Sequence, residues 1–126
     1  MLGRYRMVRG KRDPGDPLPE GERIDTRKHT RHFLRPDAKT VATLIEDPSA
    51  ANFRRFAQEY KQTIAQRFVA DRQPFDALAE RATEGDVYLG CNCPTSWNPD
   101  VRRCHTVLAL EFMKRKYPRL RVRMPR

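Results

Sequence analysis

The chain has 126 residues, of which 38% are hydrophobic and 33% charged, and its formal net charge is +10. This length predicts one domain, residues 1–126, whose core forms without disulfides or a structural metal. No apolar run reaches the roughly 18 residues of a membrane span, and the N-terminus lacks the apolar stretch of a signal peptide. We therefore expect a soluble, cytoplasmic protein without a membrane partner.

The excess positive charge lies toward the two ends of the chain. Residues 1–35 carry ten Lys and Arg against five acidic residues, and residues 101–126 carry nine against one. This asymmetry is typical of proteins with an anionic partner, so we expect an anionic small molecule or a nucleic acid. Because twenty of the twenty-six basic residues are Arg, a base-composition bias in the genome is the alternative explanation.

The first third of the chain predicts two strands joined by a loop. Residues 4–9 (RYRMVR) form a candidate first strand, and residues 22–27 (ERIDTR) form a second. Between them, residues 11–21 contain three prolines and two glycines, a composition typical of a loop.

Three helices are predicted between residues 37 and 85. The first begins at Asp37, and the third begins at Pro74, where proline fits the first helical turn, and ends at Gly85. The middle helix, residues 50–68, is the clearest because its apolar residues recur at the spacing of one helical face. These residues are Phe53, Phe56, Ala57, Tyr60, Ile64 and Phe68.

The last third predicts a strand, a helix and a short terminal segment. Residues 86–91 (DVYLGC) are an apolar run that indicates a buried strand. After a polar loop, a long helix is expected from Pro99–Asp100 to about Tyr117. Residues 119–124 alternate between basic and apolar side chains, so 119–126 is predicted as an edge strand or a frayed tail.

Strands separated by helices predict an α/β fold. We expect a three-layer sandwich with a small, mostly parallel sheet flanked by helices. Ligands of such sheets bind beyond the carboxyl ends of the strands, which places a candidate site after the second strand and after residues 86–91. The predicted core contains Phe53, Phe56, Tyr60, Ile64, Phe75, Leu78, Val87, Leu89, Leu108 and Phe112.

Three cysteines, Cys91, Cys93 and Cys104, lie within fourteen residues of one another. An odd number in a chain without a secretory signal predicts reduced thiols. Cys91 and Cys93 are the candidate catalytic thiols, since we expect a helix N-terminus to lower their pKa, with His105 exchanging the proton. Cys104 is the second candidate nucleophile, and packing in the core between Val101 and Leu108 is the alternative that we favour for it. Adjacent helical residues point about 100° apart, so we do not expect Cys104 and His105 to aim at one atom.

An anion-binding site is predicted at the same edge of the sheet. The N-terminus of the helix at Pro99–Asp100 attracts an anion through its free N–H groups and its dipole. The exit of the second strand adds a carboxylate and a guanidinium. Trp97 in the loop is a candidate stacking platform, although a simple lid on the core is the favoured alternative. The expected anion-binding residues are Asp25, Arg27, Ser96, Arg102 and Arg103.

Several segments, taken in order, resemble the family catalogued as domain of unknown function 488, which includes the YeaO-like proteins. They are the Asp-x-Arg at Asp25–Arg27, residues 53–60 (FRRFAQEY), residues 75–82 (FDALAERA) and residues 87–110, where a strand leads through a Cys-containing loop to Cys104–His105. The similarity covers roughly residues 4–117. In many members an Arg follows the Cys-His pair, and here Thr106 takes that place. The resemblance implies a three-layer α/β sandwich.

The sequence leaves several functions open. The first is a Cys-dependent enzyme that acts on an anionic, phosphate-bearing substrate, and the second is a non-catalytic module that binds a nucleotide or a nucleic acid. A zinc site formed by Cys91, Cys93, Cys104 and His105 is the third, although their spacing is not a common zinc-finger pattern. A structural role without a small ligand is the fourth. We expect no cofactor.

Overall fold

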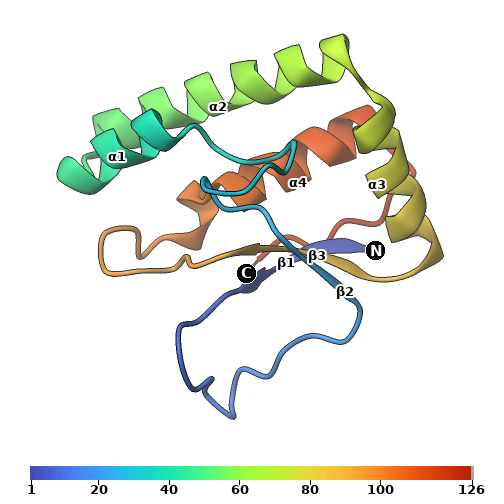
Figure 1. The fold of residues 1–126 in the computed structure, drawn as a ribbon, viewed down its shortest axis with the longest axis horizontal. Helices are drawn as coiled ribbons and strands as arrows, with labels where there is room; N and C mark the ends of the chain where they lie inside the picture. Colours follow the sequence, from blue (N-terminus) through green and yellow to red (C-terminus); the bar gives the residue numbers. More distant parts are fainter. Residues whose placement is uncertain (126) are drawn as a thin grey trace.

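The computed structural model describes residues 1–125, which form three strands and four α-helices (Figure 1). The strands are β1 (Leu2–Arg6), β2 (Glu22–Asp25) and β3 (Val87–Cys91). The helices are α1 (Ala38–Glu46), α2 (Ala50–Ala70), α3 (Gln73–Glu84) and α4 (His105–Lys116), and a 3-10 turn, η1 (Val101–Arg103), precedes α4.

The strands form one parallel sheet in the order β1-β3-β2. The apolar β3 lies at the centre, where Val87 pairs with Leu2 on one side and with Glu22 on the other. Both neighbours run parallel to β3, so the carboxyl ends of all three strands meet at one edge of the sheet. The predicted parallel α/β fold is confirmed.

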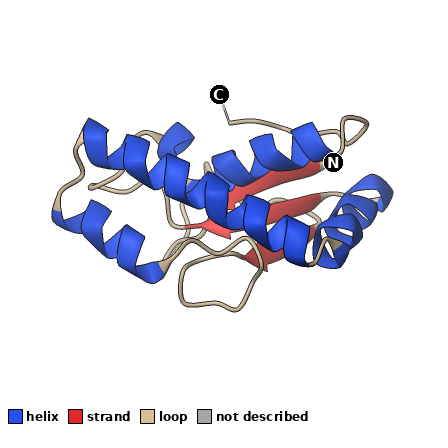
Figure 2. Ribbon diagram, turned by 90° about the horizontal axis from the view of Figure 1, so that it is seen from above, coloured by secondary structure: helices blue, strands red, loops and turns tan. Residues whose placement is uncertain are grey.

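The fold has three layers, which are the sheet, helix α4 and helix α2 (Figure 1). Helix α4 packs against β1 and β3, and α2 packs against α4 on the side away from the strands. Figure 2 shows helices lying over the near side of the sheet, and Figure 1 shows the loop of residues 7–21 extending away from the helices on the other side. None of the helices in the described part of the chain combines the length and apolarity needed to cross a bilayer.

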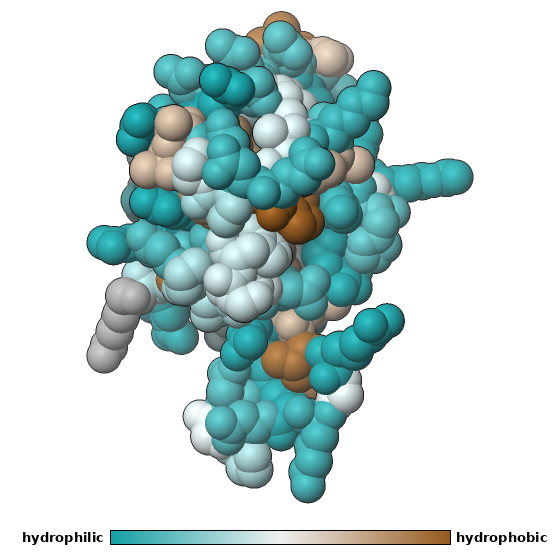
Figure 3. Space-filling model, turned by 90° about the vertical axis from the view of Figure 1, so that its left-hand side faces the viewer, coloured by the Kyte–Doolittle hydropathy of each residue, from teal (hydrophilic) through white to brown (hydrophobic). Residues whose placement is uncertain are grey.

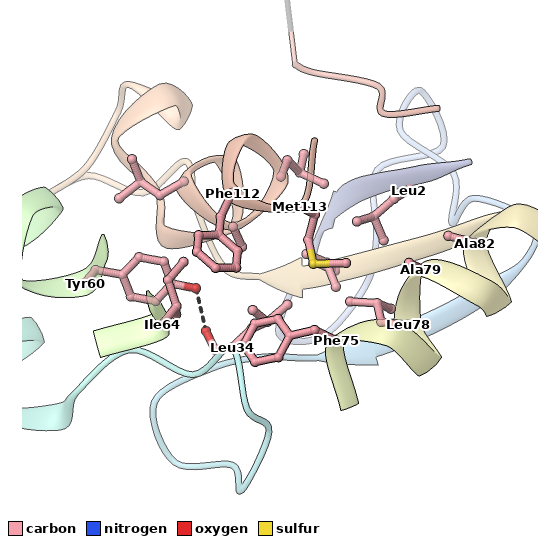
Figure 4. Close-up of a cluster of buried hydrophobic side chains, with 14 of the residues drawn as sticks. Leu2, Leu34, Tyr60, Ile64, Phe75, Leu78, Ala79, Ala82, Phe112 and Met113 are labelled. Atoms are coloured by element: carbon pink, nitrogen blue, oxygen red, sulfur yellow. Dashed lines mark hydrogen bonds between the residues drawn. The ribbon is translucent and has the colours of Figure 1, made fainter. Parts of the chain in front are cut away.

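The core lies between the sheet and the helices (Figure 4). All ten residues predicted from the apolar pattern are buried, which confirms the stripe on α2 and the inward faces of α3, β3 and α4. The stripe includes one polar group, the hydroxyl of Tyr60, which donates a 2.8 Å hydrogen bond to the carbonyl of Leu34. This bond satisfies a hydroxyl that would otherwise be buried without a partner.

Two predicted strands at the ends of the chain differ from the structure. β1 covers residues 2–6 rather than 4–9, because Arg6 pairs with Cys91, the last residue of β3, and residues 8–9 lie beyond it. Near the C-terminus, Val122 forms a single parallel bridge with Leu2, so this segment only touches the outer edge of β1. Arg126 lies outside the described residues.

The predicted helix from Pro99 is wrong at its start. The carboxylate of Asp100 accepts the N–H of Arg102, and the N–H of Cys104 donates to the carbonyl of Val101, which closes the separate turn η1. Cys104 then adopts an extended conformation with ψ 144°, and the α-helix begins only at His105. Cys104 is therefore the N-cap residue of α4 rather than a residue within the helix.

Candidate thiol site at the strand ends

A pocket of about 210 Å³ lies at the carboxyl edge of the sheet. Its walls come from residues 27–29 after β2, from the loop after β3 and from the start of α4, with α1 and α2 closing the far side. The two strand exits thus face one crevice, as expected from the parallel topology. The face that carries α1 and the loop after β3 is mostly hydrophilic, with only small hydrophobic patches (Figure 3).

The three cysteines converge at this pocket. Their sulfur atoms all lie within 4.8 Å of one another, although Cys91 ends β3, Cys93 lies in the loop and Cys104 caps α4. All three are free thiols; Cys93 and Cys104 are buried, and Cys91 is partly exposed. We call Cys91, Cys93 and Cys104 the thiol cluster.

A chain of hydrogen bonds ends on the sulfur of Cys104. Nε of Arg4 donates to Oγ1 of Thr106 over 2.8 Å, and Oγ1 of Thr106 lies 3.1 Å from Sγ of Cys104. Because a guanidinium can only donate, the threonine oxygen accepts from Arg4 and its own hydrogen is directed to the sulfur. A donated hydrogen bond of this kind stabilises a thiolate more than a thiol.

The position of His105 fixes which ring nitrogen carries the proton. Nε2 lies 3.0 Å from both the carbonyl oxygen and the hydroxyl oxygen of Thr26, and because that hydroxyl donates its own hydrogen to the carbonyl of Gly90, both oxygens act as acceptors and the proton is assigned to Nε2. In the neutral ring Nδ1 is then free to accept, and it lies 3.9 Å from Sγ of Cys104. The expected divergence of Cys104 and His105 is wrong, because it holds only for two residues inside a helix and Cys104 is an extended N-cap.

The thiols also shift one another's pKa values. Hydrogen bonds from Cys91 and Cys93 hold the pKa of Cys104 well below its usual value, with a further contribution from His105. The hydrogen bond with Cys104 conversely raises the pKa of Cys91, and it raises that of Cys93 to about 11. This is the reverse of the expectation from the sequence, because Cys104 is the thiol whose ionised form is stabilised by hydrogen bonds from the other two.

Asn98 is a buried polar residue beside the thiol cluster, and it also lines the pocket. Its Nδ2 donates to Sγ of Cys93 over 3.3 Å, whereas its Oδ1 has no partner among the described residues. Exchanging the two amide atoms would only leave the nitrogen without a partner instead. A buried polar atom without a protein partner is normally paired with an ordered water, an ion or a ligand.

Positively charged side chains surround the mouth of the pocket. Arg27 donates from Nε and Nη2 to the carboxylate of Asp25 at 3.0 and 2.9 Å, and from Nη1 to Asn92 at 3.3 Å. Its side chain is therefore held in place at the wall, and the same contact lowers the pKa of Asp25. The guanidinium of Arg103 lies 4.8 Å from the ring centre of Phe53 and also lines the pocket.

Some residues predicted for the site lie elsewhere. Ser96 is exposed and does not line the pocket, and Arg102 is exposed and paired with Asp100 at 3.1 Å. Asp25 does not line the pocket either and acts by holding Arg27. Trp97 is stacked on Phe53, with 6.4 Å between ring centres, so this face of its ring is already covered.

Four residues that shape the site were not predicted from the sequence. Asn98 was visible only as one polar residue of a loop. The contacts of Arg4 with Thr106 and of Thr26 with His105 join residues that are far apart in the sequence. Their contributions depend on which strand lies beside which helix, and composition and periodicity carry no such information. They are Arg4, Thr26, Asn98 and Thr106.

No family model, curated protein or solved structure matches the chain. The resemblance to the family catalogued as domain of unknown function 488 therefore stays a prediction. Fold and site define the class of protein instead: a small parallel α/β domain with a cluster of free thiols at the carboxyl edge of its sheet.

Proposed function

We propose that the protein is a thiol-dependent enzyme that acts on a small anionic substrate, with Cys104 as the nucleophile. The observation that carries this proposal is the placement of Cys104 at the N-cap of α4, with the hydroxyl of Thr106 donating to its sulfur. A helix N-terminus and a hydrogen-bond donor both favour the thiolate, which is the reactive form of cysteine.

The neighbouring residues have distinct roles in this proposal. Nδ1 of His105 lies 3.9 Å from the sulfur and accepts the thiol proton, while the carbonyl of Thr26 keeps Nε2 protonated. Arg27 and Arg103 at the pocket wall attract the negative charge of the substrate. The pocket volume of about 210 Å³ suits a small molecule, such as one bearing a single phosphate group.

Two further expectations belong to the same proposal. Three free thiols support a cytoplasmic location, where thiols remain reduced. The ordered set of motifs from Asp25 to His105 supports membership of the family catalogued as domain of unknown function 488, whose Cys-His pair coincides with the proposed nucleophile and base.

The proposal is tested by comparing two alkylating reagents of similar size, anionic iodoacetate and neutral iodoacetamide, on reduced, metal-free protein. Mass spectrometry of the modified peptides assigns the rate to each thiol. We expect Cys104 to react fastest, and its iodoacetate-to-iodoacetamide rate ratio to exceed that of free cysteine because cations surround the pocket. Inorganic phosphate should slow the reaction.

Arg103 and Arg102 provide a matched pair of variants, because only Arg103 lines the pocket. R103Q should lower the rate ratio, whereas R102Q, which removes the same charge one residue away, should leave it nearly unchanged. Fastest alkylation at Cys91, or a rate ratio equal to that of free cysteine in the wild-type protein, would contradict the proposal.

A further inference from the structure

We infer that the thiol cluster is a binding site for zinc, with Cys91, Cys93 and Cys104 as three sulfur ligands. The inference rests on one observation: the sulfur atoms of these residues, which come from a strand end, a loop and a helix N-cap, all lie within 4.8 Å of one another. This inference goes beyond the proposed function and does not rest on it, because a cation needs only the convergence of the sulfurs.

The distances are close to those of a zinc–thiolate site. A Zn–S bond of about 2.3 Å places the sulfurs of a tetrahedral site about 3.8 Å apart, so the widest gap here must close by about 1 Å. Cys91 is partly exposed and has room to move. The other two sulfurs each accept a hydrogen bond from a neighbouring side chain and so define the fixed side of the site.

The surroundings of the cluster are those of a site built for thiolates. Nδ2 of Asn98 donates to Sγ of Cys93, and the hydroxyl of Thr106 donates to Sγ of Cys104. Such donors outside the first ligands orient the sulfurs and offset their negative charge. Arg27, held in place by the carboxylate of Asp25, adds a positive charge to the wall of the pocket that Cys91 also lines. The two hydrogen-bond donors, Asn98 and Thr106, are buried side chains packed against the cluster.

His105 lies beside this cluster in the form that binds metals. Its Nδ1 is unprotonated in the neutral ring and lies 3.9 Å from Sγ of Cys104, while Nε2 donates to the carbonyl of Thr26. Metal-bound histidines commonly donate their other N–H to a backbone carbonyl in this way. The zinc site that the sequence spacing disfavoured is therefore supported by the extended conformation of Cys104, which turns its sulfur toward the histidine ring.

The inference is tested on the full-length, reduced and metal-free protein by titration with Zn²⁺ against a chromophoric chelator. We expect one zinc ion per chain, with each of C91S, C93S and C104S weakening the affinity at least tenfold. H29Q is the matched control, because His29 lines the same pocket but is exposed and apart from the cluster. Its affinity should equal that of the wild type.

X-ray absorption of the zinc-loaded wild-type protein gives a second readout that needs no variant to fold. We expect three sulfur neighbours at about 2.3 Å from the metal. Failure to retain zinc, a shell of only nitrogen and oxygen, or affinity unchanged in all three Ser variants would overturn the inference. The alkylation experiment uses metal-free protein, so either proposal can fail while the other stands.

Discussion

Arg4 and Thr106 are separated by 102 positions in the sequence and joined by a 2.8 Å hydrogen bond. Arg4 also donates from Nη2 to the carbonyl of Cys93 over 2.7 Å. One side chain of β1 therefore contacts both the loop after β3 and the first turn of α4, the two segments that carry the buried thiols.

Replacing Thr106 by Val tests the role of this hydrogen bond. Valine keeps the shape of the side chain but removes the donor to Cys104, which is 3.1 Å away. A hydrogen bond to a charged group contributes about 1.5 kcal/mol or more, so T106V should raise the pKa of Cys104 and slow its iodoacetamide alkylation roughly tenfold at pH values below that pKa.

The control is T63V on α2, whose hydroxyl bonds only to a helix carbonyl at Glu59. Its alkylation rate should match the wild type. An unchanged rate in T106V, with the variant shown to be folded by circular dichroism, would mean that the hydroxyl does not support the thiolate.

The sequence predicted the elements that obey a local pattern. The stripe from Phe53 to Ile64 follows the helical period, and β3 follows from an uninterrupted apolar run, so both required only neighbouring residues. The parallel arrangement of the strands then placed Arg27 beside the loop after β3. This much of the site follows from pattern and topology.

The remaining part of the site depends on a local bend and on distant contacts. The apolar period of residues 101–112 continues through η1 into α4, so it does not reveal that Cys104 is extended. That conformation depends on the carboxylate of Asp100 and decides which thiol caps the helix. The contact of Thr26 with His105 in turn spans 79 positions and needs the folded sheet.

Removing the side chain of Phe56 tests the core assignment. Phe56 is 6% exposed on the inner face of α2, and F56A should lower the free energy of unfolding by about 3–5 kcal/mol. Urea denaturation measures this change. Val69 on the same helix is 86% exposed, so V69A should alter stability by less than about 0.5 kcal/mol. A loss below about 1 kcal/mol in F56A would contradict the packing.

His32 predicts a dependence of stability on pH. Burial, with the charge of Arg81 nearby, lowers the pKa of His32 from 6.5 to about 4, and its Nδ1 accepts the N–H of Leu34 over 3.1 Å. Between these two pH values the unfolded chain binds a proton that the folded protein does not. Stability contributed by the neutral ring is therefore present above pH 6.5 and declines as the pH falls toward 4.

The test is the midpoint of urea unfolding between pH 7 and about 4.5. H32N keeps an acceptor near the position of Nδ1 but cannot be protonated there, so its midpoint should fall less steeply than that of the wild type. H29N, at an exposed histidine, should follow the wild-type curve. Parallel curves for wild type and H32N would show that His32 does not titrate as described.

The basic C-terminal segment gives the prediction on nucleic acid. Arg119, Arg121 and Arg123 are exposed, and the segment lies along the outer edge of β1 through the bridge at Val122. If these side chains contact phosphates, the affinity for single-stranded DNA falls with salt, and the slope of log K against log salt shrinks by about 0.7 for each arginine removed. Fluorescence anisotropy at several salt concentrations measures that slope.

The control for this series removes equal charge from a different surface. Arg54 and Arg55 are exposed on α2, away from the C-terminal segment, so R54Q/R55Q should lower the slope much less than R119Q/R121Q. Equal reductions in the two double variants would indicate that only net charge matters, because a diffuse field does not depend on where the charges lie. Absence of binding by the wild type at low salt would remove nucleic acid as a partner and leave the small anion of the thiol pocket.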